Sequence, residues 1–127
     1  MVRIKRVYDA VSRRDGMRIL VDRLWPRGLK KENVNVVKWM KELGPSTELR
    51  KSFGHDPARW EEFRKRYKAE LKRPGARVML KEISTAAAQG TVTLVYSAKD
   101  EEHNQAVVIM EVLGALSDAS TGKSPQD

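Results

Sequence analysis

Two short segments of the chain carry side chains that could bind an anion. Residues 22–28 have the sequence Asp-Arg-Leu-Trp-Pro-Arg-Gly, in which two arginines, Arg23 and Arg27, flank Trp25. Guanidinium groups are planar, permanently charged donors that suit phosphate or carboxylate, and an indole ring can stack on a planar group. Residues 97–104, Ser-Ala-Lys-Asp-Glu-Glu-His-Asn, form the second segment. Together these residue types predict an anion-binding pocket between two loops.

The second segment would complete this pocket with Lys99 as a further positive charge, the Ser97 hydroxyl as a hydrogen-bonding group and Asp100 as a further polar contact. The N–H groups at the start of the helix that follows would favour an anion as well. A purely structural interpretation stays open. The two arginines could pair with Asp22, Asp100 or Glu102 and lock the loops, while Ser97 caps the helix with Asp100 at its third position.

Catalysis in the same pocket is a further hypothesis, with hydrolase or transferase chemistry. Asp22 could act as a general base or hold a divalent cation, Ser97 could act as a nucleophile, and His103 could exchange protons near neutral pH. Neither Gly-x-Ser-x-Gly nor a phosphate-binding glycine motif nor His-Glu-x-x-His is present. The sequence therefore leaves open whether the protein is an enzyme, and it identifies no cofactor.

The two histidines do not predict a metal site, because His55 and His103 are 48 positions apart. His55 stands before Asp56-Pro57, where a turn into a helix is the simpler interpretation. For His103 the simpler interpretation is an exposed residue in a first helical turn.

The chain carries 25 Lys and Arg against 17 Asp and Glu, which gives a net charge of +8 and a pI near 9.9. Most of the excess lies in the first third of the chain. The alternative hypothesis is therefore a nucleic-acid-binding module without catalysis, which would use a basic N-terminal face. The basic residues of that face would be Arg3, Lys5, Arg6, Arg13, Arg14, Arg18, Arg23, Arg27, Lys30 and Lys31. No known DNA-binding motif accompanies them, and a solvated surface would explain them equally.

Composition predicts a single globular domain over residues 1–116, followed by a disordered tail over residues 117–127 that has no large apolar side chain. With no cysteine, the chain has no disulfide or thiolate chemistry. Its longest aliphatic run has five residues, so no membrane interaction is expected. We expect a cytoplasmic protein, whose oligomeric state the sequence does not indicate.

Hydropathy patterns predict strands over residues 2–8, 17–22 and 91–96. Helical spacing of apolar residues, together with capping residues, predicts helices over residues 33–43, 57–71, 79–90 and 106–113, and Ser46 starts a short turn over residues 46–53. The link over residues 9–16 is too short for a helical crossover, which favours an antiparallel pairing of the first two strands. The expected fold is therefore a small α/β domain, with a short mixed sheet of about three strands flanked by four to five helices.

The strand over residues 17–22 and the strand over residues 91–96 are separated by helices, which predicts a parallel pair. Ligands of open α/β sheets bind beyond the carboxyl ends of the strands. Both candidate segments directly follow these strands, so they should meet there.

Four ordered motifs resemble the YeaO-like branch of a domain-of-unknown-function family, number 488. They are Arg-Val-Tyr-Asp at residues 6–9, Leu-Val-Asp-Arg-Leu-Trp-Pro-Arg-Gly at 20–28, Pro-Ser-Thr-Glu-Leu-Arg-Lys at 45–51 and Tyr-Ser-Ala-Lys-Asp at 96–100. The resemblance covers about residues 3–114 and implies a compact α/β fold without a known activity. Other branches have cysteines near residues 97 and 103, so no thiol role carries over to this chain.

Overall fold

Four parallel strands form the sheet in the computed structural model, which describes residues 1–122. The strands are β1 (Val2–Arg6), β2 (Met17–Leu20), β3 (Lys38–Trp39) and β4 (Val92–Tyr96). Their order in the sheet is β1-β4-β2-β3, and every pairing is parallel. The α/β class is confirmed, with one more strand than expected and with no antiparallel pair among the described residues.

The link between β1 and β2 explains why the expected antiparallel pairing is wrong. The two strands are not neighbours, because β4 lies between them and pairs with both. Ten residues, 7–16, connect them, and an extended chain of that length spans up to about 33 Å. A five-residue strand is only about 17 Å long. The link can therefore return to the amino-terminal edge of the sheet with only a short 3-10 helix, Arg13–Asp15, and no α-helix.

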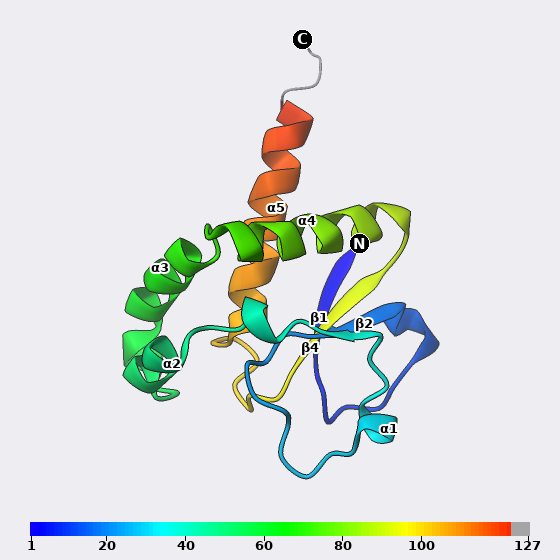
Figure 1. Ribbon diagram of the computed structural model, residues 1–127, viewed down its shortest axis with the longest axis horizontal. Coiled ribbons are helices and arrows are strands. Elements are labelled where there is room, and N and C mark those ends of the chain that lie inside the picture. Colours follow the sequence, from blue (N-terminus) through cyan, green and yellow to red (C-terminus); the bar gives the residue numbers. More distant parts are fainter. Residues whose placement is uncertain (123–127) are drawn as a thin grey trace.

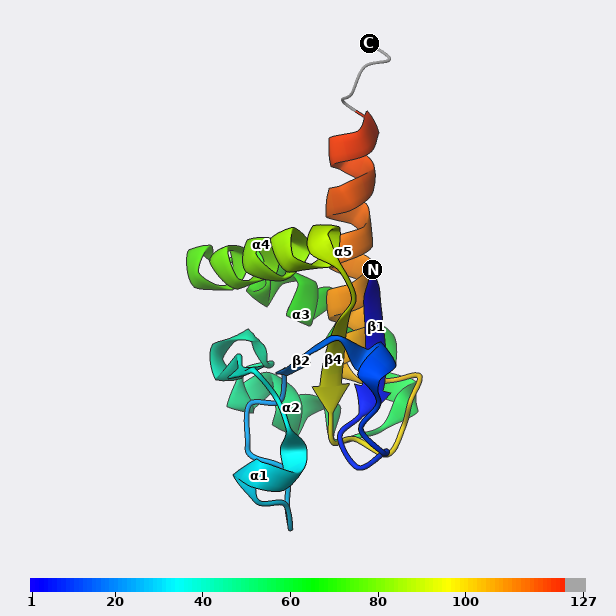
Figure 2. The ribbon, with the colours of Figure 1, turned by 90° about the vertical axis from the view of Figure 1, so that its right-hand side faces the viewer.

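Five helices complete the fold (Figure 1). They are α1 (Lys31–Val34), α2 (Thr47–Phe53), α3 (Trp60–Glu70), α4 (Pro74–Gln89) and α5 (Gln105–Gly122). Helix α5 projects beyond α4, away from α1 (Figures 1 and 2). It includes residues 117–122 of the segment predicted as a tail, whereas residues 123–127 of that segment lie outside the described residues. No described helix combines the length and apolar character needed to cross a membrane.

Alternating side chains place the two faces of the sheet in different surroundings. Ile19 and Leu94 point into the main core, which is built largely with α3, α4 and α5. Leu20 and Val95 point into a smaller apolar cluster that Trp25 and neighbouring residues of the segment after β2 cover. Because both faces are covered, all five residues of β4 are buried.

The prediction of a helix over residues 33–43 is wrong. Helix α1 ends at Asn35 in a left-handed conformation (φ 52°), after which β3 pairs with β2. The indole N–H of Trp39 donates to the Asp22 carbonyl at 2.7 Å, and its ring packs edge-on against Trp25 at 5.3 Å. These long-range contacts override the helical spacing of the apolar residues.

A buried ion cluster fixes the link between β1 and β2. Asp15 is 1% exposed and accepts hydrogen bonds from Arg18 Nη1 at 2.7 Å, from Lys5 Nζ at 3.1 Å and from the Ser12 amide at 3.0 Å. Burial by itself raises the pKa of Asp15, but these hydrogen bonds outweigh it and the net pKa is lowered. The next residue, Gly16, has φ +62°, and a Cβ there would lie 2.2 Å from the Thr91 carbonyl oxygen.

We expect Asp15→Asn to destabilise the fold by about 3–5 kcal/mol at neutral pH, because Arg18 is 3% exposed and would lose its buried partner. Since the folded-state pKa of Asp15 is lowered, its contribution is present above the ordinary aspartate pKa and disappears as the pH falls through the folded value. Urea denaturation at several pH values measures this difference. Asp9→Asn, at an exposed position, is the matched control. Equal stability of Asp15→Asn and wild type at pH 7 would contradict the assignment.

Candidate functional site

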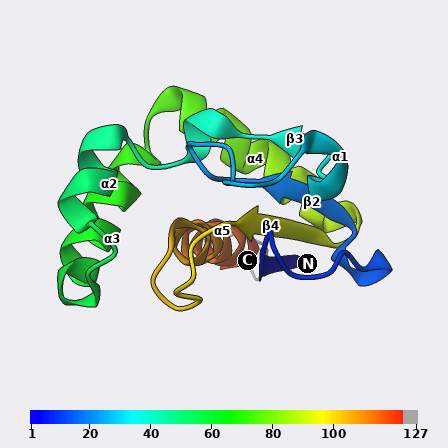
Figure 3. The same cartoon turned by 90° about the horizontal axis from the view of Figure 1, so that it is seen from below.

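A cleft of about 720 Å³ lies beyond the carboxyl ends of β2 and β4. Its lining comes mainly from three segments: the loop after β2, the segment from the end of β4 to the start of α5, and α2 with its flanking residues. Figure 3 shows these segments around the same end of the sheet. The first two are the loops predicted to converge. The third, α2, is a wall that the sequence did not indicate.

Asp22 joins the first two walls. It is 6% exposed, and its carboxylate accepts hydrogen bonds from the Ser97 amide at 3.1 Å and from the side-chain amide of Gln105, in the first turn of α5. Burial raises the pKa of Asp22, while the hydrogen bonds of Ser97 and Gln105 and the charge of Arg50 offset part of that rise. Asp22 therefore holds the end of β2 to the segment that follows β4.

Arg23 joins the first wall to the third. Its Nε donates to the Pro45 carbonyl at 3.2 Å and its Nη2 to the Gly44 carbonyl at 2.9 Å. A Cβ at Gly44 would lie 2.7 Å from the Arg23 backbone nitrogen, so the two segments approach too closely for any larger residue. Arg23 thus locks two segments together, but through backbone carbonyls rather than through the carboxylates that the structural interpretation proposed.

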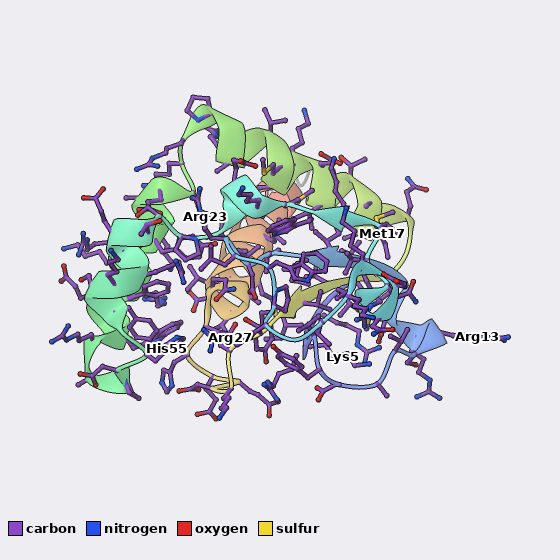
Figure 4. All side chains as sticks on the ribbon, turned by 60° about the horizontal axis from the view of Figure 1, so that its bottom comes forward. Lys5, Arg13, Met17, Arg23, Arg27 and His55 are labelled. Carbon is purple, nitrogen blue, oxygen red and sulfur yellow. The ribbon has the colours of Figure 1, made fainter. Side chains whose placement is uncertain are left out.

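Arg27 is exposed and lines the cleft. Its backbone carbonyl accepts a hydrogen bond from the Tyr8 hydroxyl at 2.9 Å, which anchors the loop. Its guanidinium group has no carboxylate within ion-pair distance among the described side chains. Figure 4 shows Arg27 and His55 at the same end of the molecule, on different walls of the cleft.

Trp25 also lines the cleft, but most of its contacts are internal. The indole N–H donates to the Leu29 carbonyl at 2.6 Å, and the ring packs against Trp39 within the smaller apolar cluster. The indole is therefore held rigidly, with part of its surface left to the cleft.

The predicted residues of the second loop divide into two groups. Ser97 and His103 line the cleft, whereas Lys99 and Asp100 do not. Lys99 is exposed. Asp100 caps the segment before α5, since its carboxylate accepts from the Glu102 amide at 2.9 Å and the His103 amide at 3.0 Å. These backbone hydrogen bonds lower the pKa of Asp100, and its second oxygen contacts His103 Nδ1 at 2.8 Å.

Helix α2 and the turn after it supply three cleft-lining side chains that the sequence analysis did not place in the pocket: Arg50, Lys51 and His55. The helix begins at the Ser46 cap, whose hydroxyl also donates to Glu70 at 2.6 Å and so ties α2 to α3. Residues 45–51 form one of the four motifs that carry the family resemblance, and this motif was the one feature of the sequence that could have indicated a role for α2. Nothing local shows that this helix faces the two loops.

Four basic side chains line the cleft, Arg23, Arg27, Arg50 and Lys51, against one carboxylate, Asp22. Only Arg23 among these four has a hydrogen bond or ion pair from its charged group to another described residue. No group of three or more potential metal ligands comes together in the part of the chain that the structure describes. The side chains that line the cleft therefore carry a net positive charge.

Substitution of Arg23 and of Arg27, the two arginines of the predicted pocket, should change the free energy of unfolding by different amounts. Arg23→Ala deletes two charge-assisted hydrogen bonds and should lower the free energy of unfolding by about 2 kcal/mol. Arg27→Ala removes an exposed side chain and should change it by less than about 0.5 kcal/mol. Urea denaturation of both variants measures this contrast, and equal losses of stability would contradict the roles assigned here.

Comparison with known proteins gives relatives along nearly the whole chain. A family model described as "Inactive DUF488-N3 subclade" matches residues 1–126. The uncharacterized protein YeaO of Escherichia coli K12 is 44% identical over 115 residues, which cover 91% of this chain and 98% of YeaO. The uncharacterized protein Rv3073c of Mycobacterium tuberculosis is 38% identical over 112 residues, or 88% of this chain and 92% of that protein. No solved structure matches. The chain therefore belongs to the domain-of-unknown-function family 488, as a YeaO-like member.

Proposed function

We propose that this protein binds a phosphate-bearing or other small anionic ligand in the cleft, without chemistry of its own. The observation that carries the proposal is the set of three basic groups in the lining, Arg27, Arg50 and Lys51, that have no carboxylate partner among the described side chains. Arginine forks and a lysine ammonium are groups that commonly bind phosphate in proteins. A cleft of about 720 Å³ also lies within the usual range of small-molecule sites.

The position of the cleft supports the same proposal. Open α/β sheets bind ligands beyond the carboxyl ends of their strands, and this cleft lies beyond β2 and β4. Its walls are held by bonds that leave the three basic groups available: Asp22 to Ser97, and Arg23 to Pro45. A preorganised site loses less free energy on binding than one that must be ordered by its ligand.

Two observations favour binding over catalysis. Asp22, the base of the catalytic hypothesis, accepts from the Ser97 amide and from Gln105 and so holds two walls together, while His103 Nδ1 contacts Asp100 and no hydrogen bond joins His103 to Ser97 among the described side chains. The matching family model is itself described as inactive. The hydrolase or transferase hypothesis for Asp22, Ser97 and His103 therefore forms no part of the proposal.

The nucleic-acid alternative loses several of its expected contacts. Arg18 is buried against Asp15, Lys5 pairs with the same carboxylate, and Arg6 donates to the Ala98 carbonyl at 2.9 Å. These groups would have to break internal bonds before they could bind phosphates. Nucleic-acid binding remains a prediction that the same experiment can test.

Titration of the protein with inorganic pyrophosphate, followed by amide chemical shifts in NMR spectra, tests the proposal. We expect shifts in residues of the three walls. Arg27→Ala and Arg50→Ala should each raise the Kd about tenfold, which corresponds to about 1.4 kcal/mol of lost binding free energy. Arg77→Ala, at an exposed position on α4, is the matched control and should bind like wild type.

Salt dependence separates a compact anion site from a surface that tracks a nucleic-acid backbone. Binding to a single strand should fall with a log–log slope of about −0.7 per phosphate contacted. A pyrophosphate Kd that neither Arg27→Ala nor Arg50→Ala changes, or shifts confined to the β1–β2 link, would overturn the proposal.

A further inference from the structure

We propose that the cleft is built for a phosphate ester that carries a planar ring with hydrogen-bond donors, the chemistry of a nucleoside monophosphate, rather than for a free inorganic anion. This inference rests on the proposed anion site and names its ligand class. Three features of the lining carry it: a carboxylate among the basic groups, aromatic side chains on facing walls, and a histidine held in an unfavourable backbone conformation.

The carboxylate is the first feature. Asp22 holds two walls of the cleft together, but its negative charge repels a free anion. The Ser97 amide and the Gln105 side chain occupy only part of its acceptor capacity, since a carboxylate offers roughly four lone-pair positions. A ligand that satisfies both Asp22 and the basic groups must therefore combine an anionic group with an N–H or O–H donor.

The aromatic lining is the second feature. Phe53 and Phe63 line the α2–α3 side of the cleft, stacked with ring centroids 4.5 Å apart, but they are only 7% and 3% exposed and belong mainly to the core. Trp25 lies on the loop after β2, where its packing against Trp39 holds the ring in place. His103 adds an imidazole that packs edge-on against Trp60 at 5.2 Å. Rings on more than one wall suit a flat apolar group, which a simple phosphate lacks.

His55 is the third feature. It has φ +57° directly after Gly54 at φ +55°, so two consecutive residues occupy the left-handed region. Glycine adopts this conformation freely, whereas a side chain makes it unfavourable. Such residues cluster at ligand-binding sites, where the surroundings hold them in place. His55 lines the cleft beside Phe53, with ring centroids 6.3 Å apart. We assign it as a residue that contacts the planar group.

The size of the cleft fits this ligand class. A volume of about 720 Å³ is far more than one phosphate group needs, and it falls within the range that holds small organic ligands. The basic side chains come from two walls, Arg27 on one and Arg50 with Lys51 on the other. A compact phosphate between these walls would leave the aromatic surfaces for the rest of the ligand.

Calorimetric titration of the full chain with four probes tests the inference: adenosine 5′-monophosphate, guanosine 5′-monophosphate, ribose 5-phosphate and uncharged adenosine. We expect at least one nucleoside monophosphate to bind about tenfold or more tightly than ribose 5-phosphate, and adenosine to bind more weakly than either. Asp22→Asn and His55→Gly should each lower the affinity for the nucleoside monophosphate by a larger factor than the affinity for ribose 5-phosphate. Asp9→Asn is the matched control for the lost charge.

His55→Gly carries a second readout that a purely structural turn would not give. Relief of the left-handed conformation should leave Tm unchanged or raise it, even though binding weakens. A variant that loses stability together with affinity would show that His55 only supports the turn and would overturn its assignment. If Asp22→Asn fails to fold, the affinities of the wild-type protein for the nucleoside monophosphates and for ribose 5-phosphate still test the inference.

The outcomes separate this inference from the proposal on which it rests. Equal affinity for ribose 5-phosphate and both nucleoside monophosphates would overturn the ring-binding inference and leave the anion site intact. Absence of binding for all the phosphorylated probes, together with inorganic pyrophosphate, would overturn both. Much tighter binding of a single-stranded oligonucleotide, with a steep salt dependence, would identify a polymer as the ligand and would also overturn the inference.

Discussion

Two adjacent side chains at the end of β2 hold the walls of the cleft in place. The Asp22 carboxylate accepts the Ser97 amide and the Gln105 side chain, so it fixes the segment after β4 and the first turn of α5. Arg23 donates to the Gly44 and Pro45 carbonyls, so it fixes the approach to α2. Because Asp22 and Arg23 hold the walls, the other charged side chains of the lining, Arg27, Arg50 and Lys51, do not have to stabilise the fold. Arg23 therefore has a structural role, whereas Arg27, four positions later in the same loop, is available to a ligand.

The parallel sheet positions the residues at one rim of the cleft. β4 lies between β1 and β2 with both faces covered, and its carboxyl end delivers Ser97 beside Asp22. The link from β1 to β2 contains no α-helix, and the Asp15 ion cluster stabilises it. Arg6, at the end of β1, donates to the Ala98 carbonyl and thereby steadies the same loop from the other side. Three strand ends thus define one rim of the cleft.

Sequence reasoning located two walls of the cleft because their signals are local. A short apolar run typical of a buried strand precedes the loop that contains Pro26 and Gly28. A similar apolar run precedes Ser97. The third wall depends on contacts between residues far apart in the chain, such as Ser46 with Glu70, and no local pattern reports them. For the same reason the stretch around Trp39 looked helical: its apolar spacing is real, but its contacts with Asp22 and Trp25 favour a strand. Arg23 likewise bonds to carbonyls, which composition does not distinguish from carboxylates.

An electropositive cleft with one internal carboxylate gives a physical role to the rigid loop of Arg, Trp, Pro and Arg over residues 23–27. The most direct test is a crystal of the protein soaked in tungstate, an electron-dense tetrahedral anion that stands in for phosphate. Our account predicts anomalous density in the cleft, in contact with Arg27 and Arg50. A cleft that stays empty while tungstate occupies other surfaces, with these two side chains folded onto neighbouring carboxylates, would contradict it.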